Sequence, residues 1–421
     1  MKHTLSLLAL AAFAAAGAQA ATLSEMADQY VAYTKKALVA YESKDSFVRK
    51  VRFSWLEQFQ VAAVQPNGSN GAHLRKGASP VNQEFRRSWL GVTVDLASET
   101  TFRTWVRVGG LPERETYANG RTKRNFTYTD FFEIWVKQNI KPIKGLSVQA
   151  GKIKSLFTSD YITSSSAIYC PERSLVSQQF AQDSNWGVDV TYAPDKQNKV
   201  YLQLMANDRA LASKNASHPD AYRDGRGFKG EFGWEDKCFM ILGANHRFAE
   251  SENGYQQLSA QYLHDFNNKY HGKPAGANCY GLGFKDAVSL GYEMKADRLL
   301  LITNLVSAFE QQTGRGSNNI GLQIQPVYSL TPHVDLVMRY VGMTGHGACK
   351  LAADRYICTQ TTAPSWVDSL HTFYLGCDLY ASAKDKNAAK LMLGLEYTTA
   401  RAGGANCYNG WEYITAVRWN F

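Results

Sequence analysis

The chain ends in the alternating segment Trp411-Glu412-Tyr413-Ile414-Thr415-Ala416-Val417-Arg418-Trp419-Asn420-Phe421, and this segment decides the fold. Side chains of a β-strand point alternately to opposite faces, so the odd-numbered residues share one face and the even-numbered residues share the other. The odd face has aromatic residues near both ends of an apolar row. Trp and Tyr settle at membrane–water interfaces, so this face suits a strand that contacts lipid. An amphipathic strand that closes a soluble sandwich is the alternative.

The N-terminus predicts export from the cytoplasm. Lys2 and His3 precede an apolar run from Leu5 to Ala16, and Ala18-Gln19-Ala20 forms an A-x-A cleavage site. Residues 1–20 are therefore expected to be a signal peptide, cleaved before Ala21. No later run reaches the roughly 18 apolar residues of a helical membrane span, so any membrane crossing must use strands.

Composition agrees with a wall of membrane strands. Aromatic residues make up 12% of the chain, with 23 Tyr and 9 Trp, and the mean hydropathy is only -0.33. Only every second residue of a membrane strand meets lipid, so such walls average to mildly polar. The 46 basic and 37 acidic residues give a net charge of +9. This surplus indicates either an anion-attracting lumen or loops that bind acidic polysaccharide.

The strand pattern predicts one all-β domain, a transmembrane antiparallel β-barrel over residues 51–421. Alternating segments of about ten residues are separated by connections that are alternately short and long. The short ones lie at 97–100, 141–145, 193–198, 247–254, 295–298, 329–333 and 382–387. The long ones lie near 65–82, 110–127, 155–185, 209–235, 268–286, 310–318, 344–367 and 401–409. This pattern gives 16 strands when 227–234 is counted as loop. Bacterial barrels have tight periplasmic turns and long external loops, which places both termini in the periplasm and the protein in the outer membrane.

A helix is expected before the barrel, in a periplasmic segment spanning 21–50. Between residues 22 and 45, apolar side chains recur at steps of three and four residues: Leu23, Met26, Tyr30, Tyr33 and Ala37. Such a helix either gathers subunits as a short coiled coil or packs at the barrel mouth.

Seven cysteines fit an oxidising compartment and leave one thiol unpaired. Cys349 and Cys358 flank a short segment of one loop and are predicted to form a disulfide. Two further bridges are possible among four cysteines, with three pairings open: Cys170, Cys238, Cys279 and Cys407. Cys377 lies within a strand, and we expect it to be the unpaired thiol on the outer face. Since there is no C-x-x-C pair, neither a metal site nor a cofactor is expected.

Strand alternation also predicts which side chains face the lumen. Sixteen strands leave an aqueous channel, so polar faces should line water. The predicted pore-lining residues are Arg87, Arg103, Arg107, Glu133, Lys137, Asp335, Arg339 and Arg418, with Asp95, Asp189, Gln203, Lys390, Glu396 and Glu412 on the same side. Arg103 and Arg107 lie four residues apart on one face and should stack along the pore axis.

The third long loop carries the most specific motif. It contains Gly151-Lys152-Ile153-Lys154-Ser155-Leu156-Phe157 and, after a Ser-rich stretch, Glu172-Arg173-Ser174-Leu175-Val176. This wording resembles the phosphate-selective porin O and P family, in which G-[RK]-x-K-x-x-F leads to E-R-S-L-V. Phe85-Arg86-Arg87 and the closing Trp419-Asn420-Phe421 agree with the family's ends. In the related general porins, the loop at this position folds inward and narrows the lumen.

The resemblance implies a homotrimeric channel in outer-membrane lipid, in which inward Arg and Lys side chains pass anions. Lys152, Lys154, Glu172 and Arg173 are the residues predicted for the constriction loop. Glu172 and Arg173 either contact solute or pin the loop to the wall, and the two lysines are alternatively solvated charges at the rim. Because acidic side chains accompany the basic ones in the predicted lumen, we expect passive diffusion of small polar or anionic solutes, with phosphate as one candidate.

Two other functions compete with a porin. A structural or adhesive barrel with a plugged lumen would use the long loops and the N-terminal helix. A barrel enzyme needs grouped Ser, His and acidic or amide side chains, and the chain has no G-x-S-x-G motif and no shared His spacing. We therefore expect no enzymatic activity.

Overall fold

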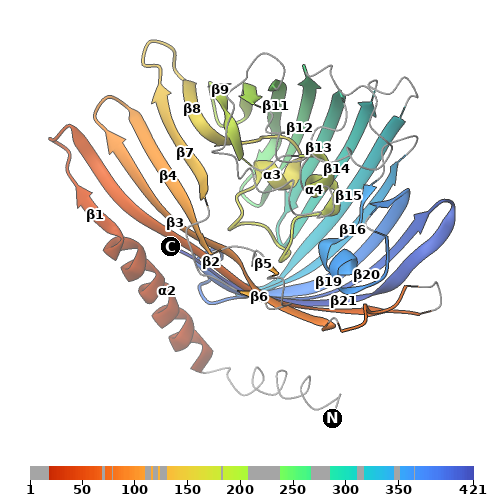
Figure 1. Ribbon diagram of the computed structural model, residues 1–421. Helices are drawn as coiled ribbons and strands as arrows, with labels where there is room; N and C mark the ends of the chain where they lie inside the picture. The colour runs from red at the N-terminus through yellow and green to blue at the C-terminus, as the bar shows by residue number, and fades with distance from the viewer. Residues whose placement is uncertain are drawn as a thin grey trace.

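Antiparallel strands joined in sequence order close into a ring in the computed structural model (Figure 1). The structure describes residues 19–68, 72–77, 79–109, 115–116, 122–123, 130–181, 184–206, 238–266, 285–310, 317–345, 351–364 and 366–421. Within these ranges the main sheet has 17 strands, of which the four-residue β1 is an addition to a ring of 16. The predicted count of sixteen strands is confirmed. The segment 227–234, whose assignment affected that count, lies outside the described residues.

The ring strands are β2 (Val48–Pro66), β3 (Val81–Leu96), β4 (Thr100–Gly109), β7 (Asp130–Asn139), β8 (Leu146–Lys154), β9 (Ser184–Tyr192), β10 (Asn198–Ala206), β11 (Cys238–Ser251), β12 (Gly254–Asp265), β13 (Asp286–Ala296), β14 (Leu299–Glu310), β15 (Ser317–Thr331), β16 (Val334–Gly345), β19 (Ser369–Tyr380), β20 (Ala389–Ala402) and β21 (Ala405–Asn420). Each pairs with its neighbour, and β2 pairs with β21 to close the ring. Two small hairpins lie outside the main sheet: β5 (Glu115–Thr116) with β6 (Thr122–Lys123), and β17 (Leu351–Ala352) with β18 (Trp366–Val367).

The strands separate an apolar outer face from a polar inner face. On β16, Leu336 and Met338 are exposed on the outside, whereas Val337 and Arg339 are buried on the inside. This alternation is what a wall between lipid and a barrel interior requires, and the backbone of each ring strand pairs with its neighbours in the closed ring.

Seven short turns join the strands at one end of the barrel, as predicted from the sequence. The prediction of a long loop over 401–409 was wrong. β20 and β21 continue through it to a two-residue turn at Gly403 and Gly404, which have φ values of 61° and 80°. Consecutive positive φ angles form the tight hairpin turn that matches strand twist, and glycine adopts them without steric cost.

The N-terminal helix α2 (Gln19–Ala37) lies along the short-turn end of the barrel (Figure 1). Ser24 contacts His333 at 2.7 Å, Ser382 donates to Asp28 at 2.5 Å, and Lys35 pairs with Asp385. The hydrogen bond from Ser382 lowers the pKa of Asp28 below its ordinary value. No helix in the described part of the chain has both the length and the apolar character needed to cross a membrane.

The expected helix over 22–45 was too long at its C-terminal end. It stops at Ala37, and Val39–Glu42 forms β1, which pairs with the start of β2. The reason is that β21 ends opposite Leu56 and leaves the earlier edge of β2 open. Backbone bonds between Phe421 and Trp55 mark the point where β1 takes over from β21.

Two inward segments fill part of the barrel interior. The segment 155–183 carries α3 (Ser159–Ile162) and α4 (Leu175–Phe180), which lie within the ring of strands in Figure 1. The second segment, which lies between β16 and β19, carries α5 (Arg355–Gln360). Both contribute buried side chains, including Phe157, Phe180 and Tyr356, to an apolar core against the inner wall.

Candidate channel site

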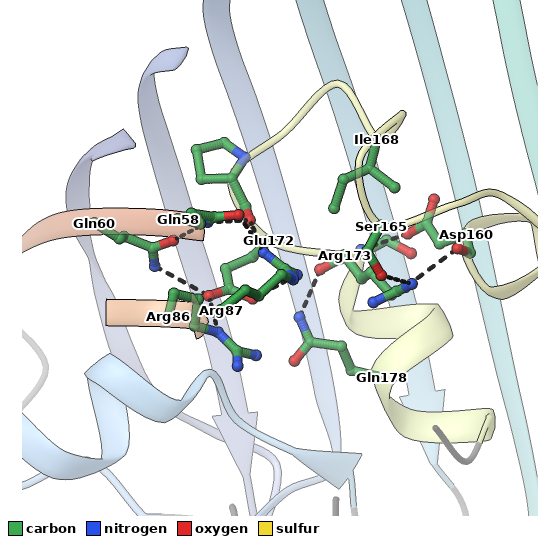
Figure 2. Close-up of polar contacts among 12 residues, drawn as sticks. Gln58, Gln60, Arg86, Arg87, Asp160, Ser165, Ile168, Glu172, Arg173 and Gln178 are labelled. Carbon is green, nitrogen blue, oxygen red and sulfur yellow. Dashed lines mark hydrogen bonds and ion pairs between the residues drawn. The ribbon is translucent and has the colours of Figure 1, made fainter. Parts of the chain in front are cut away.

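Glu172 ties the segment 155–183 to the wall formed by β2 and β3 (Figure 2). Its carboxylate accepts hydrogen bonds from Arg86 Nε at 2.6 Å and from Gln60 Nε2 at 3.0 Å. Arg87 Nη2 lies 3.9 Å from its other carboxylate oxygen. Because Glu172 is largely buried, these charge-assisted contacts are only weakly screened by water.

Gln58 gathers two arginines beneath the same loop. Its amide oxygen accepts from Arg87 Nη1 at 2.5 Å and from Arg418 Nη2 at 2.7 Å. Its amide nitrogen donates to the backbone oxygen of Pro171 at 3.0 Å, and Arg87 donates to that same oxygen at 3.0 Å. Arg418 is fully buried. The wall therefore holds the loop mainly through its backbone carbonyl groups.

Two more predicted lumen residues hold the same loop. Lys390 Nζ donates to the backbone oxygen of Ile168 at 2.7 Å, and Arg339 Nη1 donates to that of Glu172 at 2.8 Å. Arg339 also donates to Glu396 at 3.2 Å. Both residues are buried, and the loop covers their charged ends.

Arg173 holds two parts of the loop together. Its guanidinium donates to the backbone oxygen of Asp160 at 3.2 Å and to Ser165 Oγ at 2.8 Å, and it lies 4.5 Å above the Tyr161 ring. The carboxylate of Asp160 in turn accepts from the backbone nitrogen of Ser174, the N-cap residue of α4. The loop is therefore a folded unit and not an extended strap.

The second inward segment is anchored to the same part of the wall. The Tyr356 hydroxyl bonds with Gln60 at 2.5 Å and donates to Glu84. Arg75 clasps the end of α5 by donating to the backbone oxygens of Thr361 and Cys358 at 2.6 and 3.0 Å. No pattern in the sequence had predicted this second inward segment.

An open cavity of about 810 Å³ remains between the wall and the loop, toward the short-turn end. Its lining comes from the wall strands β2, β3, β4, β7, β8 and β10, from β1 and the end of β21, from the end of α2, and from the loop residues Leu156, Ile162, Ser164, Ser165 and Ser166. The basic side chains on its surface are Lys35, Lys36, Lys50, Arg52, Arg103 and Lys154, and the acidic ones are Glu42 and Glu133.

Arg103 is the central cation of this cavity. Its guanidinium carbon lies 5.1 Å from the ring centre of Trp105 and 5.9 Å from that of Trp135, and its Nε lies 4.0 Å from Glu133. Glycine at position 91 permits this packing, because a Cβ there would come within 2.9 Å of the Trp105 ring. Arg103 makes no hydrogen bond within the described part of the chain.

The remaining predicted residues are spread around the inner wall. Arg107 lies 5.4 Å from the Phe132 ring, and Lys137 pairs in the ladder with Gln149, a cavity residue. Asp335 accepts from Lys386 at 2.7 Å and from Tyr380 at 2.8 Å, near the short turns.

Lys152 and Lys154 belong to β8 and not to the loop itself, which corrects their expected position. Lys152 is buried and alternates with Ile153, a cavity residue. Lys154 lies at the end of the strand, where it bonds with the backbone oxygen of Thr163 and lines the cavity.

The structure describes some, but not all, of the cysteines for which disulfides were considered. The predicted Cys349–Cys358 bridge involves Cys349, which lies outside the described residues. Cys170, Cys238 and Cys407 are free thiols, so the two further bridges that the sequence left possible are not formed. Burial within the loop core raises the pKa of the Cys170 thiol to about 12 and keeps it neutral. Cys377 is a free thiol on the outer face, as predicted.

Gln58 and the inward aromatic residues Trp89 and Trp105 were not predicted as part of the site, although strand alternation places them on the inner face. Gln58 and Gln60 alternate with Phe59, so strand parity places them inside. Trp89 and Trp105 share the inward face with arginines that were assigned. They were not predicted to face the lumen because apolar side chains were assigned to the lipid-facing side of each strand. Among the described residues, no group of three or more His, Cys, Asp or Glu could hold a metal ion.

Comparison with known proteins agrees with this architecture. Residues 61–229 match the family model for phosphate-selective porin O and P. The OprB structure from Pseudomonas putida aligns with a TM-score of 0.52 and 13% identity, over 88% of this chain and 94% of that one. The anion-selective porin from Comamonas acidovorans aligns with a TM-score of 0.51 and 9% identity, over 88% and 99%. No curated protein matches the chain. The predicted resemblance is confirmed over residues 61–229, which match the phosphate-selective porin O and P family, and this match together with the barrel fold indicates a bacterial outer-membrane porin.

Proposed function

We propose that this porin passes small anionic solutes by passive diffusion along the cavity beside the inward loop. The observation that carries the proposal is the excess of basic over acidic side chains there, six against two. Lys36 and Arg52 form no ion pair within the described residues, so they can replace water around a passing anion. The family match and the name of the Comamonas anion-selective porin support the same preference, and phosphate is one candidate solute.

The test is electrical. Folded protein in a planar bilayer should give stable single-channel steps, and the reversal potential in a salt gradient should show anion preference. Cation preference would overturn the anion proposal while leaving the channel intact.

A plugged structural barrel is the second candidate. It is favoured by one observation, the apolar core that both inward segments build against the inner wall. Absence of channel steps from correctly folded protein would support it and would contradict the porin proposal.

We also propose a homotrimer. Glu57 supports this assembly, because it shares the outer face of β2 with exposed Trp55. Its carboxylate accepts from Ser88 Oγ at 2.7 Å, and its second oxygen has no hydrogen-bond partner among the described residues. A buried carboxyl group near the lipid boundary is costly, and a neighbouring subunit packed over this face would separate it further from lipid. Cross-linking should trap trimers of the native protein, and Glu57→Arg should weaken them; a monomeric native protein would contradict this assembly.

The domain organisation completes the proposal. Residues 1–20 are proposed to be removed on export, residues 21–50 to lie in the periplasm, and residues 51–421 to form the barrel, with an inward-folded third loop near 155–185 narrowing it. N-terminal sequencing of protein purified from outer membranes should begin at Ala21. A retained Met1 would refute cleavage.

A further inference from the structure

We infer that the open cavity holds a binding subsite for an aromatic carboxylate, an organic anion with a flat ring. This inference rests on the proposed anion channel and names a solute class for it. It follows from three features of the cavity that lie within one space: surplus positive charge, a guanidinium without a hydrogen-bond partner, and an aromatic wall.

The charge alone selects for anions. Lys50 pairs with Glu42 at 3.0 Å, and Arg103 lies near Glu133, which accounts for both acidic residues of the lining. Arg52 has no ion pair within the described ranges and faces the same space. An anion that enters the cavity therefore meets uncompensated cations.

The orientation of Arg103 selects for a carboxylate. The guanidinium carbon of Arg103 lies over the rings of Trp105 and Trp135, and no hydrogen bond within the described residues engages its N–H groups. Glu133 is 4.0 Å away, beyond hydrogen-bond distance, so it orients the cation without saturating its donors. A carboxylate matches the fork of two parallel N–H groups.

The wall beside Arg103 selects for a ring. Trp89 and Phe132 stack with their ring centres 3.9 Å apart, and Trp105 meets Trp89 edge to face at 6.1 Å. Across the cavity, the loop presents Ser164, Ser165 and Ser166. A flat apolar ring gains contact area against the Trp wall, whereas a hydrated tetrahedral phosphate gains nothing from it. The volume of about 810 Å³ suits a small organic solute.

The experiment compares solutes that differ in one feature at a time. Benzoate, acetate, inorganic phosphate and glucose are added at equal ionic strength, and block of the single-channel current is recorded. Isothermal titration of the folded protein in detergent measures binding independently. Benzoate should bind roughly tenfold more tightly than acetate, a factor that corresponds to about 1.4 kcal/mol.

Variants assign the two halves of the subsite. Trp135→Leu should remove the preference for benzoate over acetate, and Arg103→Gln should weaken both anions. Trp411→Leu on the outer face is the matched control and should change neither. Equal binding of benzoate and acetate would overturn the inference, as would phosphate binding tighter than benzoate or glucose binding as well as benzoate. If the anion preference of the current persists in those cases, the proposed channel function stands without the subsite. If no current is seen, titration still decides whether the subsite exists.

Discussion

Two groups of inward cations look the same in the sequence and differ in what surrounds them. Arg87, Arg339 and Arg418 are buried under the loop and donate to its carbonyl groups or its carboxylate. Arg103 and Arg52 face the open cavity. The difference shows that facing the lumen and being open to solute are separate properties, because a folded loop can cover part of an inner wall. We propose that the first group sets the width of the passage through its contacts with the loop, and that the second group sets which solutes prefer to enter it.

The largest effect is expected from removing the charge that anchors the loop. Glu172→Gln removes the carboxylate that pairs with Arg86 and Arg87, and breaking a buried pair typically costs about 3–5 kcal/mol. The loop should detach, so single-channel conductance should rise and proteolysis within 155–183 should become faster. Glu252→Gln, at an exposed short turn, is the control. Unchanged conductance would show that the loop does not narrow the passage.

A smaller change is expected from the second plug. Tyr356→Phe removes the hydrogen bonds to Gln60 and Glu84 without creating a cavity, a loss of about 1–3 kcal/mol when buried partners stay unsatisfied. Conductance should rise less than in Glu172→Gln. Tyr413→Phe, on the outer face, should match the native channel. An effect larger than that of Glu172→Gln would make the second segment the main restriction.

The two groups of cations are compared directly by neutralising one member of each. Arg103→Gln should shift the reversal potential toward cations and leave the loop as resistant to proteolysis as before. Arg339→Gln should leave the reversal potential nearly unchanged and make the loop less resistant to proteolysis, because it breaks the bonds to Glu172 and Glu396. Both variants lose one positive charge, so each serves as the control for the other. Equal shifts in reversal potential would erase the distinction between them.

The smallest effect concerns α2, beside the open cavity. The pKa of Asp28 is lowered in the folded protein, so its contact with Ser382 adds stability above the ordinary pKa of 3.8. That contribution should fade as the pH falls through the lowered pKa. Hydrogen-exchange protection of α2 should therefore drop at pH 3 relative to pH 6. In Asp28→Asn it should already be low at pH 6, and protection that is independent of pH in the native protein would contradict the contact's role.

Much of the barrel could be predicted from the sequence because strand period and turn length are local properties. The parity of the C-terminal strand, the seven short turns and the inward side of Arg87, Arg103, Arg339 and Arg418 all follow from residues close together in the chain. The turn at Gly403 was misread because glycines signal loops and tight turns alike. β1 could not be foreseen, since it exists only because β21 stops opposite Leu56.

The candidate site was predicted less well because it depends on distant contacts. Gln58 meets Arg418 only when the ring is closed, and Glu172 meets Arg86 only when the loop folds inward. Strand alternation predicts the face on which a side chain lies, but it does not predict whether a loop covers that side chain. No local pattern distinguishes Arg339 beneath the loop from Arg103 in the open.

The contact between Gln58 and Arg418 also fixes an order of assembly. The two residues are 360 positions apart in the chain, on the first and last ring strands. Their side chains cannot meet until the final strand has been delivered and the ring has closed, and contacts between such distant residues form slowly. The seat for the loop is thus completed at the last step of folding. A newly inserted barrel would therefore have a wider lumen until the loop binds, and a short duration of this stage would benefit the cell that assembles it.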